Sequence, residues 1–71
     1  MGEDKNMNKF YKILMEFSGG TTPSRPHLIR RYGEDLLNEC LLNHFIVSIG
    51  RNSVGEIIYA ITAEGKAQRD T

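Results

Sequence analysis

Residues 34–66 decide the fold, and they read EDLLNECLLNHFIVSIGRNSVGEIIYAITAEGK. The stretch opens on Glu34 and Asp35, and acidic residues stabilise the N-terminus of a helix. Projected at 100° per residue, this helix places one set of side chains on a common face: Leu37, Cys40, Leu41 and His44. The opposite face is polar apart from one leucine, and consists of Asp35, Asn38, Glu39, Leu42 and Asn43.

After His44 the helical period ends and two β-prone runs follow. Residues 45–49 are apolar and partly β-branched, as are residues 56–61, and the loop 50–55 between them is polar and bounded by glycines. Two such runs joined by a short loop predict an antiparallel hairpin. Thr62 can then cap a short final helix over 63–69.

Two further helices are predicted before residue 34. In 6–18 the apolar residues recur at i, i+3, i+4 and i+7, as Phe10, Ile13, Leu14 and Phe17 do, and Gly19-Gly20 can end that helix. A polar connector leads to a short helix over 26–32, which Pro26 can open with Ser24 or Arg25 at its cap. We therefore expect the order helix, helix, helix, hairpin, helix.

Composition restricts the class of protein. Seventy-one residues with 39% hydrophobic content make one small globular domain, which we expect over 6–69 after a tail over 1–5. No apolar run approaches the roughly 20 residues of a membrane span, and the acidic N-terminus is unlike a signal peptide. A single cysteine cannot form an internal disulfide, so we expect a cytoplasmic protein with no membrane association.

The residues that could carry chemistry form no catalytic or metal-binding pattern. His27 and His44 do not stand at metal-ligand spacing from Cys40, and no serine lies in a nucleophile motif. The glycines do not form a phosphate-binding fingerprint. We therefore expect no cofactor, no metal and no enzymatic activity.

Two motifs within this order resemble the winged helix-turn-helix family of DNA-binding domains. Leu37-x-x-Cys40-x-x-x-His44-Phe45-Ile46 is similar to the end of that family's recognition helix, and Tyr59-Ala60-Ile61-Thr62-Ala63-Glu64-Gly65-Lys66 is similar to the exit from its wing, Tyr-x-Leu-Thr-x-x-Gly-Lys. Together they cover nearly the whole chain in the right order. Three departures stand out: His44 replaces a glycine, Cys40 replaces a leucine, and the third helix offers no lysine or arginine.

The resemblance implies an α+β fold, three helices followed by a two-stranded wing and a short C-terminal helix. It also implies a transcriptional regulator that binds double-stranded DNA as a homodimer, with phosphate contacts from the second helix and the wing. The residues that it places at DNA are Arg25, His27, Arg30, Arg31, Asn38, Asn43, Arg51 and Asn52.

The charge pattern leaves a second interpretation open. The nine basic and nine acidic residues cancel, but 21–33 carries three arginines and no acid, whereas 34–39 carries three acids and no base. The alternative is a winged-helix module that binds a protein partner and not DNA. Its interaction patch would consist of Asp35, Glu39 and Leu42.

Overall fold

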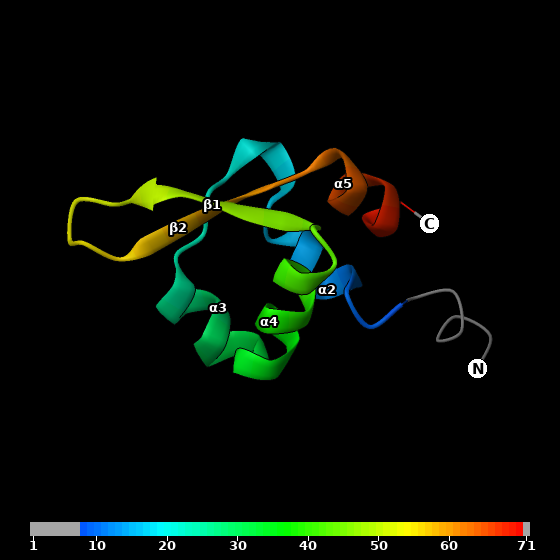
Figure 1. Cartoon of the computed structure of the whole chain (residues 1–71), viewed down its shortest axis with the longest axis horizontal. Helices are drawn as coiled ribbons and strands as arrows, with labels where there is room; N and C mark the ends of the chain where they lie inside the picture. Colours follow the sequence, from blue (N-terminus) through cyan, green and yellow to red (C-terminus); the bar gives the residue numbers. More distant parts are fainter. Residues whose placement is uncertain (1–7, 71) are drawn as a thin grey trace.

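The computed structural model describes residues 8–70, which form an α+β fold of four helices and one two-stranded antiparallel hairpin (Figure 1). The predicted tail, 1–5, lies outside the described residues. In chain order the elements are helix α2 (Tyr11–Met15), the 3₁₀ turn η1 (Ser18–Gly20), helices α3 (Arg25–Tyr32) and α4 (Glu34–Leu42), strands β1 (Ile46–Arg51) and β2 (Ile57–Ile61), and helix α5 (Ala63–Arg69). This order is compatible with a winged-helix layout.

The core lies where α2, α3 and α4 meet the base of the hairpin, and it is small. Its buried side chains are Ile13, Leu14, Phe17, Leu28, Leu37, Cys40, Ile46 and Tyr59. Phe10 completes the face predicted for the first helix, and its ring meets that of Phe45 edge-on at 5.1 Å. The apolar periodicity therefore identified the buried residues of α2, and Leu37 and Cys40 of α4, correctly.

The first helix is shorter than its apolar pattern predicts. Regular α-helix covers only Tyr11–Met15, because the Asn8 side chain accepts a hydrogen bond from the Phe10 backbone N–H at 2.9 Å and forms a turn there. At the other end, Glu16 and Phe17 donate to carbonyls three residues back, which tightens the helix before Gly19 reverses the chain at φ 74°. The prediction of one helix over 6–18 was wrong at both ends.

His44 ends α4 and is exposed, although the helical projection places it on one face with Leu37 and Cys40. His44 has φ 61°, and it is the one non-glycine residue among 8–70 in the left-handed region. The His44 N–H donates to the Leu41 carbonyl at 3.1 Å, and the Phe45 N–H donates to the Cys40 carbonyl at 2.9 Å. These two bonds form a Schellman motif with histidine where glycine is usual. The chain turns at residue 44, so the helical projection no longer applies there.

Both strands begin one residue later than predicted and the first extends to Arg51, whereas the hairpin ends at Ile61 as predicted. Ser48 pairs with Tyr59 and Gly50 pairs with Ile58, so a bulge at Ile49 interrupts the register. On the far side of β2 the connector forms a single bridge, from Ser24 to Ile58. Within the described residues, β1 is therefore the open edge of the sheet.

Helix α5 is capped as predicted and lies against α2, β2 and residue 45, just before β1. The Thr62 hydroxyl accepts from the Gly65 N–H at 3.0 Å and itself donates to the carbonyls of His44 and Phe45. Gly65 is buried, and a Cβ on it would stand 2.1 Å from the Phe45 carbonyl oxygen.

Over residues 8–70, every helix is too short or too polar to cross a bilayer.

Candidate nucleic-acid interface

Arg25 joins three elements at the first turn of α3. Its Nη1 donates to the Tyr59 hydroxyl at 3.1 Å, and its Nη2 forms an ion pair with Glu34 Oε2 at 3.0 Å. The bond to Tyr59, with the nearby Glu34 charge, raises the pKa of Arg25. Because Tyr59 belongs to β2 and Glu34 opens α4, the guanidinium that we expected at a phosphate links the hairpin to both helices.

Two more of the expected DNA contacts converge on one carboxylate, and we call Glu16, His27, Arg31 and Tyr32 the Glu16 cluster. Glu16 accepts from the Tyr32 hydroxyl at 2.6 Å, lies 3.1 Å from His27 Nε2 and lies 3.2 Å from Arg31 Nε. The bonds from Tyr32 and then His27 lower the pKa of Glu16. The cluster ties α2 to α3 and occupies His27 and Arg31.

The other two arginines that we expected at DNA, Arg30 and Arg51, have no acidic partner among residues 8–70. Arg30 is exposed on the last turn of α3. Arg51 is exposed at the end of β1, where its Nη1 donates to the Gly55 carbonyl at 2.8 Å. Arg30 and Arg51 are therefore the two predicted cations whose charge no carboxylate in the described chain compensates.

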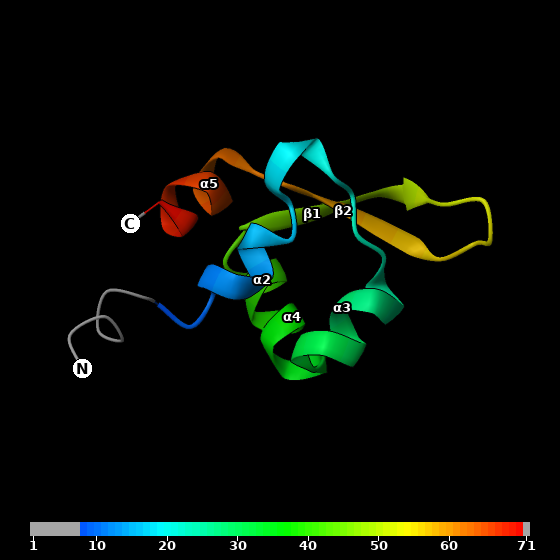
Figure 2. The same cartoon turned by 180° about the vertical axis from the view of Figure 1, so that it is seen from behind.

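The loop between the strands, residues 52–56, is organised by Asn52. The Asn52 Oδ1 accepts from the backbone N–H groups of Val54 and Glu56, at 3.1 and 2.9 Å, and its Nδ2 donates to the Glu56 carboxylate at 3.0 Å. The side chain that we expected at DNA is therefore used to shape the loop. This loop extends beyond the helices in both views of the molecule (Figures 1 and 2).

The outward face of α4 is acidic, as predicted, but its side chains differ in what they contact. Glu39 pairs with Lys9 at 2.7 Å, and the Asn43 Nδ2 donates to the Glu39 carbonyl at 2.8 Å. Asp35 and Asn38 are exposed and have no hydrogen bond or ion pair within residues 8–70. Asn43 is therefore bound to its own helix end, whereas the Asn38 side chain has no partner within residues 8–70.

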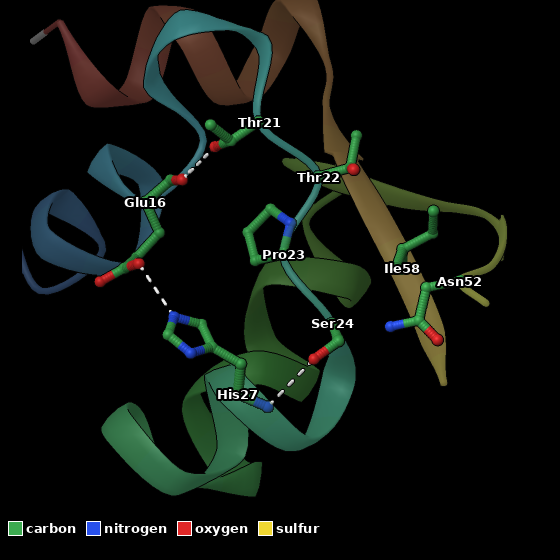
Figure 3. Close-up of a pocket in the computed structure, with 8 residues that line it drawn as sticks. All are labelled: Glu16, Thr21, Thr22, Pro23, Ser24, His27, Asn52 and Ile58. Carbon is green, nitrogen blue, oxygen red and sulfur yellow. Dashed lines mark hydrogen bonds and ion pairs between the residues drawn. The ribbon is translucent and has the colours of Figure 1, made fainter. Parts of the chain in front are cut away.

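An open groove of about 510 Å³ lies between the connector, α3 and the base of the wing (Figure 3). Its lining is rich in hydroxyl groups, but the arrangement is not that of a nucleophile and base. The Ser24 hydroxyl accepts from the backbone N–H of His27 at 3.4 Å, while the His27 ring is turned toward Glu16. The groove thus places no serine beside the imidazole.

The lone thiol and the acidic residues likewise form no reactive or metal-binding site in the described chain. Cys40 is fully buried, and burial raises the pKa of its thiol to about 11. No group of three or more histidine, cysteine, aspartate or glutamate side chains converges within residues 8–70.

The exposed apolar side chains are unevenly distributed. Of the five large exposed hydrophobic residues among 8–70, four fall between α4 and the wing loop: Leu42 at 78%, Val47 at 44%, Ile49 at 51% and Val54 at 74% exposure. Of the predicted interaction patch, Leu42 and Asp35 are exposed, whereas Glu39 is half-buried and paired.

Comparison with known proteins gave no match, since no family model fits the sequence and neither a curated protein nor a solved structure is similar to it.

Proposed function

We propose that this chain is a small DNA-binding regulator of the winged-helix type, with α4 facing the major groove and α3 and the wing contacting the phosphate backbone. The observation that carries the proposal is the pair of exposed arginines, Arg30 and Arg51, which lack an acidic partner in the described chain. They stand on the elements that precede and follow α4, where a duplex seated on α4 presents its two backbones.

In this proposal Arg30 and Arg51 are the main phosphate contacts, because Arg25 and Arg31 already form ion pairs. Arg25 pairs with Glu34, and Arg31 pairs with Glu16. To bind a phosphate, each of these arginines must give up or share its ion pair. Each phosphate that a cation neutralises contributes about −0.9 to the slope of log affinity against log salt. Two uncompensated arginines therefore predict weak binding with a slope of about −2 per monomer, which a homodimer would double.

The test is a titration of a random-sequence duplex, followed by fluorescence anisotropy at about 20 mM salt and at increasing salt. The double variant R30A/R51A should weaken binding for every sequence and reduce the salt slope by about 2. The matched control is K66A, which removes an exposed cation from α5 and should leave affinity nearly unchanged. Equal losses in both variants, or no binding by the wild type, would exclude the proposed surface.

A second candidate function is a protein-interaction module, and the exposed apolar residues near β1 favour it. Scattered surface leucines are ordinary, but four of five large exposed hydrophobic residues fall in one segment, 42–54. The open edge of β1 offers unpaired backbone groups beside Val47 and Ile49. Under this function V47K should abolish self-association in sedimentation velocity, whereas M15K, a change at the exposed methionine of α2, should not.

A further inference from the structure

A second hollow, of about 410 Å³, lies between η1, the end of β2 and α5. Two cationic side chains of α5, Lys66 and Arg69, line it, and no acidic residue of the described chain does. The groove of Figure 3 differs in this respect, because Glu16 is part of its lining. We call this second cavity the α5 hollow. Its volume lies within the range of small-molecule sites, and its charge favours an anion.

Arg69 lies in the α5 hollow with its side chain only 20% exposed. Its Nε forms an ion pair with Asp70 Oδ1 at 3.2 Å, but Asp70 is 69% exposed and the pair does not involve the two Nη groups. Those Nη groups belong to the fork that binds a carboxylate or a phosphate through two parallel hydrogen bonds. Lys66 stands three residues earlier on the same helix and has no acidic partner among residues 8–70, so the two cations are neighbours on the surface of α5.

The part of the α5 hollow that η1 forms carries no side chains at its two glycines. Gly19 and Gly20 have φ 74° and 81°, in the left-handed region that glycine adopts without steric cost. A Cβ on either residue would meet no atom within 4 Å, so the backbone there faces open space. Ala60 and Ile61 of β2 add half-buried apolar surface to the same hollow. A ligand can therefore approach the backbone closely and also bury a small apolar group.

We infer that the α5 hollow binds a small organic oxyanion, a carboxylate or phosphate group joined to a short apolar body. The Arg69 fork and the Lys66 ammonium hold the oxyanion, and Ala60 and Ile61 contact the apolar body. Because Arg69 is partly buried, salt screens its pairing with the ligand less than it screens an ion pair at the open surface.

This site is separate from the surface proposed for DNA. Both views show η1 and α5 on the side of the hairpin away from α3 and α4 (Figures 1 and 2). A duplex that lies across α4, between Arg30 and Arg51, therefore leaves the α5 hollow open. The inference goes beyond the DNA binding proposed above and does not depend on it.

The experiment is a titration followed by backbone amide NMR at about 0.15 M salt, where a lone surface cation is largely screened. The probes are benzoate and phenyl phosphate, which share an apolar ring, with benzamide as the uncharged control and inorganic phosphate as the control without a ring. We expect both charged aromatic probes to give saturating shifts at residues 19–21 and 66–69, with a Kd of about 1 mM. The probe that binds more tightly identifies the preferred oxyanion as a carboxylate or a phosphate.

Three variants test the assigned contacts. R69Q removes the guanidinium but keeps a long polar side chain, and it should weaken binding by about tenfold or more. R69K keeps the charge without the planar fork, so its loss of affinity should be smaller. K12Q, the matched control, removes an exposed cation of α2 outside the hollow and should leave the Kd unchanged. The far-ultraviolet circular dichroism of all three should match the wild type.

The absence of saturating shifts with both charged aromatic probes would overturn the inference. Equal binding of benzamide, or inorganic phosphate that binds as tightly as phenyl phosphate, would overturn it too, since the charge or the apolar surface would then contribute nothing. An R69Q affinity equal to that of the wild type would have the same meaning. No duplex is present in these titrations, so their result and that of the DNA titration are independent.

Discussion

Gly65 provides the sharpest test of the packing between α5 and the hairpin. Alanine normally stabilises a helix relative to glycine by about 1 kcal/mol, so helix propensity alone predicts that G65A is more stable. The structure predicts the reverse, because the new Cβ would stand 2.1 Å from the Phe45 carbonyl oxygen and 2.7 Å from Cγ1 of Ile61, where ordinary contact begins at 3.4 Å. The neighbouring atoms must therefore move by about 1 Å.

That movement also disturbs the cap of α5. The Phe45 carbonyl accepts from the Thr62 N–H at 2.9 Å and from the Thr62 hydroxyl at 3.0 Å. Overpacking costs about 1–3 kcal/mol and a lost cap about 1 kcal/mol, against the propensity gain of about 1 kcal/mol. We expect G65A to lose about 2 kcal/mol of unfolding free energy, which lowers the melting temperature by about 8–16 °C.

Urea unfolding followed by circular dichroism measures this free energy directly. The control is K66A, which places alanine at the next, exposed position of α5 and should change stability by no more than about 0.5 kcal/mol. If G65A is as stable as the wild type or more stable, the close approach of α5 to residue 45 is incorrect.

Two further predictions concern single residues. The bonds from Tyr32 and His27 hold the pKa of Glu16 below its ordinary 4.5, so its contribution to stability is present above about pH 4.5 and is lost as pH falls through the folded-state pKa. Urea unfolding from about pH 7 to about pH 3 should therefore show a steeper loss of stability for the wild type than for E16Q, and parallel curves would exclude the Glu16 cluster. H44G should stabilise the chain by about 0.5–1 kcal/mol, because glycine adopts the left-handed conformation of residue 44 without the steric cost that histidine bears. A less stable H44G in the same assay would mean that the His44 side chain makes a contact of its own.

The sequence predicted the order of elements and most of the core because both depend on local periodicity. Ile13, Leu14 and Phe17 are buried as their spacing indicated, and Thr62 caps α5. The helical projection fails at His44, because a projection cannot show where the chain leaves the helix. The position of His44 at a glycine site of the family pattern was the signal that indicated the left-handed turn.

The candidate site was less predictable, because periodicity does not determine which charged side chains meet. Arg31 and Glu16 are fifteen residues apart in the chain, and Arg25 and Tyr59 are thirty-four apart. Nothing local in the sequence indicates that these groups pair, so Arg25 and Arg31 were assigned to DNA together with Arg30 and Arg51. Gly65 shows the same limit, since its closeness to the Phe45 carbonyl depends on the tertiary packing of α5.

The central claim is that duplex DNA lies across α4, between the exposed arginines of α3 and the wing. Backbone amide NMR during a titration with random-sequence duplex at about 20 mM salt tests it most directly. We predict shifts at Arg30, Arg51 and the first turns of α4 that fade as salt is raised. The absence of shifts at low salt, or shifts confined to α2 and α5, would contradict the claim.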